Sequence, residues 1–172
     1  MRPFLLPLTL LFAPVAITAQ QGNVVEPEAI GVMHIITADS GLRPLPREIA
    51  KSGSKQRGLM AVVSYAELRG AKSAFRPEAR RTFEFVIRLP AGIDPGKFRL
   101  YRWDVKANTR ELILQEQGGV LRRVKSDPSV VLLQVTQYGP TSYKLTVSTE
   151  LLPGEYGFSA TDSQDVFTFG ID

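Results

Sequence analysis

The sequence predicts an all-β protein built from two antiparallel sheets, with about nine strands. Apolar residues recur at every second position, which is typical of strands with one buried face. Turn-forming residues return about every 8–12 positions, the spacing expected of a sandwich or barrel. No segment has the apolar spacing of an amphipathic helix; residues 71–81 come closest, and Pro77 interrupts them.

The clearest strand lies at residues 83–89. Its four odd-numbered residues, from Phe83 to Leu89, are all apolar and share one face, whereas Glu84 and Arg88 lie on the other. This alternation predicts a half-buried strand. The sequence Pro-Ala-Gly-Ile-Asp-Pro-Gly that follows is rich in turn residues and ends it.

Upstream, residues 29–37 and 59–65 are expected to be strands, because both are rich in residues that favour β structure. Residues 42–57 between them are polar and contain two prolines. We therefore expect a long connection there, in which residues 49–55 could form a short helical turn.

Downstream, Val130 to Val135 is an apolar run rich in β-branched residues, which predicts a central strand buried on both faces. Gly118-Gly119 predicts a tight turn, since glycine tolerates a positive φ. Together the expected strands favour an immunoglobulin-like sandwich. The remaining strands are expected at residues 98–105, 109–115, 120–124 and 143–147, and in a C-terminal hairpin of residues 155–160 and 166–169.

Residues 1–19 have the pattern of a secretory signal peptide. Arg2 supplies a positive charge, an apolar run extends from Phe4 to Ile17, and the small residue Ala19 precedes a polar stretch. The run is too short and too rich in proline to predict a membrane-spanning helix. We therefore expect export to the periplasm or the cell exterior, in a bacterium, with residues 20–172 forming a single β-sandwich domain that has no transmembrane segment.

Composition narrows the function classes. The chain has no cysteine, so we expect packing and hydrogen bonds to hold the fold without disulfides, and a lipid-modified cysteine is excluded. Residues 43–125 are strongly basic, whereas residues 20–42 and 126–172 are acidic. Such asymmetry can indicate a nucleic-acid partner. We expect instead that the acidic ends fold against the basic middle, which makes nucleic-acid binding unlikely.

No recognisable catalytic, cofactor or metal motif is present. His34 is the only histidine, and no Gly-x-Ser-x-Gly motif accompanies it, so we expect a packing or surface role. A zinc site would need further His or Cys ligands. Asp162 to Asp165 holds two acids and indicates a turn rather than a calcium loop. Carboxylates that could in principle form an acid/base pair, but that ordinary ion pairs explain, are Glu84, Asp94, Asp104, Glu111, Glu116 and Glu155.

The segment Phe98 to Trp103 contains the one candidate ligand platform. Alternation places Arg99, Tyr101 and Trp103 on one face of a strand. An exposed face of this composition could stack on sugar rings. The alternative, which we favour, is that Tyr101 and Trp103 belong to the core, because large aromatic side chains usually bury most of their area.

The most specific local motif is Leu-Leu-Pro-Gly-Glu-Tyr, residues 151–156. Pro153 fixes φ and Gly154 permits a bend, so Tyr156 can turn inward and donate its hydroxyl to the backbone upstream. This is the pattern of a tyrosine corner in Greek-key sandwiches. Its role is structural.

The C-terminal part of the chain resembles a group of secreted bacterial proteins. They end in a Leu-x-Pro-Gly-Glu-Tyr segment and a Phe-Gly-x-Asp terminus, which match residues 151–156 and 169–172 here. Arg76, residues 83–88 and Asp94-Pro95 also resemble that group. The resemblance implies a β-sandwich and export, and it implies no activity and no site residues.

The leading functional hypothesis is an exported, non-enzymatic β-sandwich with a structural or protein-interaction role in the bacterial envelope or outside the cell. Its expected partner is another envelope or secreted protein, and it predicts exposed sheet edges or an apolar patch without a deep polar pocket. The alternatives are a glycan-binding module and an enzyme of undetected type, which would need a cleft with converging acids.

Overall fold

The computed structural model describes residues 25–57, 61–78, 80–117, 129–161 and 163–172. In these ranges the chain is all-β, its named strands pair antiparallel, and a single 3-10 turn, η1 (Pro95–Lys97), interrupts them. No helix among them is long and apolar enough to cross a membrane. The expected signal peptide, the Gly118-Gly119 turn and the strand at residues 120–124 lie outside the described residues.

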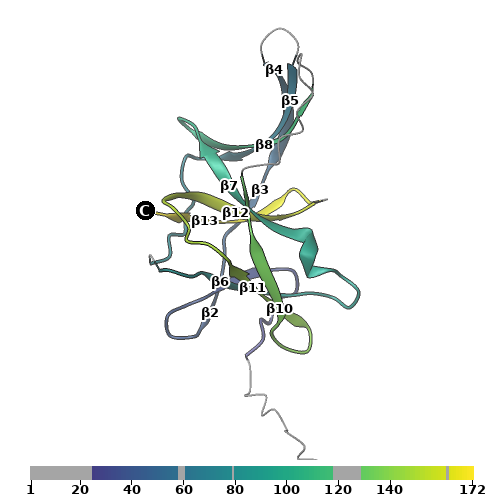
Figure 1. The fold of residues 1–172 in the computed structure, drawn as a ribbon, viewed down its shortest axis with the longest axis vertical. Helices are drawn as coiled ribbons and strands as arrows, with labels where there is room; N and C mark the ends of the chain where they lie inside the picture. Colours follow the sequence, from purple (N-terminus) through teal and green to yellow (C-terminus); the bar gives the residue numbers. More distant parts are fainter. Residues whose placement is uncertain (1–24, 58–60, 79, 118–128, 162) are drawn as a thin grey trace, which may run out of the picture.

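A five-stranded sheet forms the lower part of the molecule in Figure 1, with strand order β10-β11-β6-β1-β2. Its middle strand, β6, carries the alternating residues expected at 83–89. Phe85 and Ile87 point to the core, and the strand pairs with β1 on one side and β11 on the other. The five strands are β1 (Met33–Ile36), β2 (Leu42–Pro44), β6 (Glu84–Arg88), β10 (Leu133–Gln137) and β11 (Ser142–Val147).

An eight-stranded sheet of order β3-β13-β12-β7-β8-β5-β4, with β9 also on β7, forms the rest. It curls strongly at β7. Residues 98–103 of this strand pair with β12, Leu100 and Tyr101 also pair with β9, and the last two residues pair with β8. Strands β4, β5 and β8 rise from this bend (Figure 1). The strands are β3 (Arg47–Ile49), β4 (Lys51–Arg57), β5 (Ala61–Arg69), β7 (Phe98–Val105), β8 (Thr109–Gln117), β9 (Val130–Val131), β12 (Gly154–Ala160) and β13 (Asp165–Ile171).

The main core lies between the five-stranded sheet and the layer formed by β7, β12 and β13. Its centre is aromatic: the ring of Phe85 lies edge-on to that of Phe158, with 4.7 Å between centroids, and 5.2 Å from that of Phe169. Both sheets contribute to this one cluster, so neither buries its apolar face without the other.

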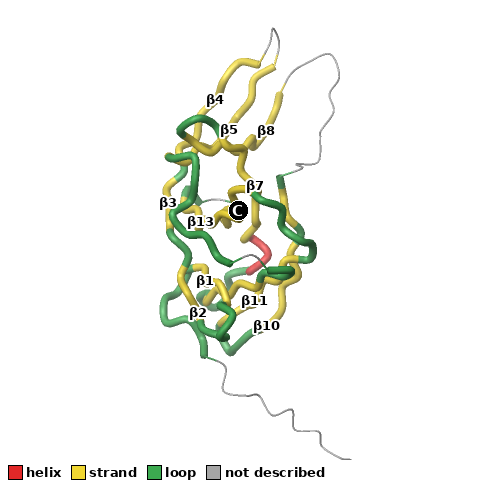
Figure 2. Tube along the Cα trace, turned by 90° about the vertical axis from the view of Figure 1, so that its left-hand side faces the viewer, coloured by secondary structure: helices red, strands yellow, loops and turns green. Residues whose placement is uncertain are grey.

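A second, smaller apolar cluster covers the opposite face of β7, β12 and β13. It joins Trp103 and Val166 to Leu68 and Leu112 of the curled-over strands β5 and β8. Successive side chains of a strand point to opposite faces, so Leu100 enters the main core while Trp103 enters this cluster. Figure 2 shows the resulting order along the long axis, with β13 and β7 between β1, β11 below and β5, β8 above.

Several strands are confirmed. The expected segments at residues 83–89, 98–105, 109–115, 143–147 and the C-terminal hairpin correspond to β6, β7, β8, β11 and the β12–β13 pair. Each has strong period-two alternation or a clear bounding turn in the sequence.

Two expectations are wrong. Residues 42–57 are not a long connection with a helical turn: they form β2, β3 and β4, which pair through backbone bonds and need no apolar alternation. Residues 130–135 are not a central strand buried on both faces. The chain changes sheet at Leu132, which is 69% exposed, and both flanking strands lie at sheet edges. The described residues thus hold thirteen strands rather than about nine.

Candidate functional site

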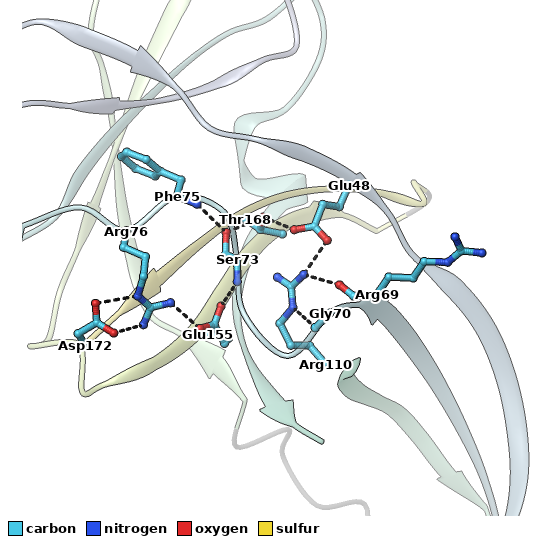
Figure 3. Close-up of polar contacts among 10 residues, drawn as sticks. All are labelled: Glu48, Arg69, Gly70, Ser73, Phe75, Arg76, Arg110, Glu155, Thr168 and Asp172. Atoms are coloured by element: carbon cyan, nitrogen blue, oxygen red, sulfur yellow. Dashed lines mark hydrogen bonds and ion pairs between the residues drawn. The ribbon is translucent and has the colours of Figure 1, made fainter. Parts of the chain in front are cut away.

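A buried chain of polar side chains crosses the outer face of β12 and β13 (Figure 3). It links the irregular segment at residues 70–76 to the sheet. Ser73 and Glu155 are almost entirely buried, and Thr168 is fully buried. Polar groups at this depth need partners, because an unpaired one costs about 1–3 kcal/mol.

One end of this chain is an ion-pair triad centred on Arg76. Its guanidinium binds the carboxylate of Glu155 through Nη1 at 2.7 Å and that of Asp172 through Nε at 2.8 Å. The hydrogen bonds that Arg76 donates to Asp172 and to Glu155 raise its pKa above the usual range. The bond from Arg76 holds the pKa of the Asp172 carboxyl below its usual value. Arg76 and Asp172 are therefore charged at neutral pH.

The other end runs through two hydroxyl groups to Glu48. Thr168 donates its hydroxyl to Glu48 Oε1 at 2.6 Å. Since that proton is used, the 3.0 Å contact between Thr168 Oγ1 and Ser73 Oγ has Ser73 as its donor. The backbone N–H of Ser73 donates to Glu155 Oε2 at 2.7 Å, which joins the two ends.

Arg110 of β8 fastens the curled-over strands to the same chain. It is 1% exposed, and its Nη2 lies 2.6 Å from Glu48 Oε2. Nε and Nη2 also donate to the carbonyls of Gly70 and Arg69. Among the described residues, Nη1 of Arg110 and the indole Nε1 of Trp103 are the buried side-chain donors without a partner.

The contacts of this arrangement join three parts of the chain, namely the segment at residues 70–76, the β12–β13 pair and strand β8. The Ser73 hydroxyl donates to another hydroxyl, not to a base, so it has no activating partner. The carboxylates of Glu48 and Glu155 are occupied by donors. None of Ser73, Thr168 and Arg110 lines either of two hollows found on the surface.

Those hollows are open depressions. One of about 490 Å³ is lined by residues that include Arg80, Glu150 and Asp172, and one of about 260 Å³ lies beside β3 and β5. Arg80 is engaged with the carbonyl of Ile36 at 2.7 Å. Within the described ranges, no three His, Asp or Glu side chains gather in a way that could hold a metal ion.

The three residues of the candidate platform do not form one exposed face. Trp103 is 3% exposed and lies in the second apolar cluster, with Tyr101 half-buried against it and Arg99 exposed. The backbone of Gly157 approaches so closely that a Cβ there would meet the indole nitrogen at 3.0 Å. The indole faces are thus covered by β12 and by the curled-over strands.

At the corner motif, the Tyr156 hydroxyl donates to the carbonyl of Leu152 at 2.7 Å, the bond expected of a tyrosine corner. Burial raises the pKa of this hydroxyl. The carbonyl of Pro153 also accepts a 2.9 Å bond from Arg102. Gly154 does not have a positive φ; a Cβ there would meet Arg102 Nε at 3.0 Å. Gly154 is therefore not required here for a left-handed backbone conformation.

The other candidate residues have local partners. His34 is buried and its Nδ1 lies 3.0 Å from the carbonyl of Val32. Asp94 caps η1, accepting from Gly96 N–H at 2.8 Å. Asp104 and Glu111 do face each other across β7 and β8, but Lys55 binds the Glu111 carboxylate. Glu84 is paired with Lys144 at 2.9 Å.

A single uncharged segment, residues 129–137, forms sheet edges on one side of the molecule, and we call it the neutral edge. Its first part, β9, pairs with β7 in the curled sheet, and its second part, β10, is the end strand of the five-stranded sheet. Four of the five residues of β10 are exposed, among them Val135 at 38%. In Figure 2, β10 lies on the outside of the molecule.

The hydrogen-bonding pattern between β10 and β11, which we call the phase of β10, determines which of its backbone groups point outward. Tyr138 N–H donates to the carbonyl of Ser142, and Ser148 N–H donates to that of Leu132. In an antiparallel pair, residues alternate between bonded and non-bonded positions. Gln134 and Thr136 therefore bond to β11. The N–H and C=O groups of the residues between and beside them point away from the sheet; these are Leu133, Val135 and Gln137.

The other end strands in the described structure carry protective features. β2 and β3 are three residues long; β2 ends in Pro44, and β3 contains Arg47 and Glu48. β4 carries Lys51 and Lys55. Short length, proline and lysine are the means by which proteins block edge pairing. β10 has none of the charged or proline residues, so its edge is open to another strand.

Neither the buried chain nor the neutral edge was recognisable as a site in the sequence. The signal for the first was the polar Thr168 and the small Gly170 on an otherwise apolar strand, where a Cβ on Gly170 would overlap Arg76. The signal for the second was nine residues without a charge. No protein-family model, curated protein or solved structure that was compared with the chain matches it.

Proposed function

We propose that the chain is an exported, non-enzymatic protein with an immunoglobulin-like sandwich, which acts in the bacterial envelope or outside the cell by binding another protein. The pattern of residues 1–19 supports export. Two antiparallel sheets that share one core support the sandwich. The segment around Leu132 also joins the two sheets directly, because its first part pairs in one sheet and its second part in the other.

The observation that carries the interaction role is the neutral edge. Three outward-facing residues of β10 offer N–H and C=O groups to an incoming strand, in a segment without a charged side chain. An extended partner segment can add to such an edge through main-chain bonds, while pockets for alternate side chains provide specificity. The protected edges β2, β3 and β4 make β10 the preferred position.

The glycan-binding alternative stays a prediction, and no observation favours it. It requires Trp103 to reach solvent, whereas the indole is 3% exposed. Stacking on a sugar ring needs an accessible aromatic face.

The test is capture of partners from the native envelope with wild-type protein and with Val135→Pro. The N–H of Val135 points outward, so proline there removes no bond to β11 but denies an incoming strand one donor. Val135→Thr is the matched control, because it keeps the N–H and the β-branched shape.

We expect wild type and Val135→Thr to capture the same partners and Val135→Pro to lose them. Circular dichroism and Trp103 fluorescence must show that all three proteins have the same fold. A folded Val135→Pro protein that captures the wild-type partners would contradict the proposal.

A further inference from the structure

We propose that β10 pairs antiparallel with β10 of a second copy of this chain, about a two-fold axis through Val135. This inference rests on the proposed function, since it names one partner for the same edge. It would join two five-stranded sheets into one continuous sheet across the axis. The argument follows from the phase, the composition and the surroundings of β10.

The phase makes the strand complementary to itself. With the axis at Val135, the outward N–H and C=O of Val135 face those of Val135 in the second copy. Leu133 of each copy faces Gln137 of the other. Every outward N–H then meets an outward C=O, which allows about six backbone hydrogen bonds. A homodimer of this kind uses the same surface on both copies, as a two-fold interface requires.

The side chains are compatible with this register. Val135 would lie beside its own symmetry mate, an apolar β-branched pair that stabilises a sheet. The pairing would cover part of the Val135 side chain, which is 38% exposed in the single chain. On the opposite face Gln134 would lie beside Thr136 of the second copy, a pair of neutral polar groups that can hydrogen-bond to each other.

Electrostatics does not oppose the pairing. The nearest charge on the adjacent strand is Lys144, which lies opposite Thr136 and is paired with Glu84. Across the axis, the two Lys144 positions are three strand spacings apart, about 14 Å. This exceeds the screening length of about 8 Å at physiological ionic strength. If β4 paired with β4 of a second copy instead, Lys51 and Lys55 would lie against their own symmetry mates or against each other.

The experiment uses single cysteines, because the chain has none and any disulfide must therefore join two copies. Across the axis, the two Cα atoms of residue 135 would lie about 5.5 Å apart, within the range that a disulfide spans. Val135→Cys should form a reducible dimer under mild oxidation. Ile93→Cys is the control, because it has a similar exposure of 41% and does not belong to β10.

We expect the full-length Val135→Cys protein to cross-link at least about tenfold faster than Ile93→Cys, since only the former would be held in disulfide geometry. Light scattering of the wild type should give the mass of two chains, and that of Val135→Pro the mass of one. Equal cross-linking of the two cysteines would overturn the inference, and so would a wild type that is monomeric at high concentration.

The outcomes also separate this inference from the proposed function. A monomeric wild type whose capture of envelope proteins is lost in Val135→Pro excludes the second copy and retains the edge as a docking site for a different protein. A dimer that persists in Val135→Pro places the contact elsewhere and overturns the inference.

Discussion

The guanidinium of Arg76 lies 2.7 Å from the carboxylate of Glu155, whose side chain is 4% exposed. This pair connects the irregular segment before β6 to the outer face of β12. The same guanidinium binds Asp172, but that carboxylate is largely in water. One arginine thus makes a buried and an exposed ion pair, and the two are expected to differ in their contribution to stability.

Glu155→Ala should destabilise the fold by about 1–3 kcal/mol, because it leaves the buried N–H of Ser73 without its acceptor. It also removes the buried one of the two carboxylates that bind Arg76. Asp172→Asn is the control, and we expect only a small change because exposed ion pairs are screened by solvent. Urea unfolding measures both. Equal losses in the two variants would contradict the structural role assigned to Glu155.

Tyr156→Phe should lower the free energy of unfolding by about 1–2 kcal/mol without changing the fold, since it removes one buried hydrogen bond to Leu152. Tyr138→Phe, in the turn after β10, is the matched control. Thermal unfolding followed by circular dichroism compares the two. A Tyr156→Phe melting temperature equal to that of wild type would mean that the corner bond adds nothing.

Trp103→Ala should cost about 3–5 kcal/mol, as large deletions in a core do. The chain has one tryptophan, so its emission reports this site alone. We expect emission shifted to the blue and poorly quenched by iodide. A stable Trp103→Ala protein, together with wild-type emission that responds to added glycan, would favour the stacking platform instead.

Glu26 gives a pH-dependent contribution at the turn between β10 and β11. Its carboxylate accepts from the Ser142 hydroxyl at 2.6 Å and from Thr141 N–H at 3.0 Å, and these bonds lower its pKa below the usual 4.5. A pKa lower in the folded state means that the stabilisation is complete above about pH 4.5 and is lost as the pH falls through the folded-state value.

Melting temperatures of wild type and Glu26→Gln should therefore differ at pH 7 and converge as the pH is lowered toward 3. Glutamine keeps the shape and an acceptor oxygen, so the variant isolates the effect of the charge. A difference that stays constant over this range would show that ionisation of Glu26 plays no part.

The parts of the fold that the sequence predicts well are those where local pattern and burial coincide. In β6, from Glu84 to Arg88, each apolar residue that alternation assigns to one face reaches the core. Strands β2, β3 and β4 escaped prediction because they are mostly polar and are held by backbone pairing, β2 and β4 with strands near in sequence and β3 with the distant β13. A period-two pattern reports burial, not backbone pairing.

Trp103 illustrates a different limit. Alternation places it opposite Leu100, and burial of a large aromatic residue is a reasonable expectation. The pattern cannot say which of two faces is covered, because Leu68 and Leu112 come over it only when the sheet curls at β7. The tyrosine corner of Tyr156, in contrast, lies within five consecutive positions, from Leu152 to Tyr156, and is accessible to local reasoning.

The buried polar chain was beyond prediction for a related reason. Ser73 meets Thr168 across 95 positions of sequence, and Thr168 meets Glu48 across 120. No local spacing encodes such contacts. The neutral edge is recognisable in the sequence as a strand, but not as an edge. An apolar β-branched run fits a central strand as well as an unprotected edge strand.

The central claim, that β10 is a docking edge, is tested most directly by amide hydrogen exchange at single residues of β10, measured by NMR in dilute protein and again at high concentration or with captured partners. We predict an alternating response. The outward amides of Leu133, Val135 and Gln137 should exchange fast when free and become protected on docking, while Gln134 and Thr136, bonded to β11, change little. Fast exchange at Val135 in both conditions, with protection arising on other strands, would contradict the claim.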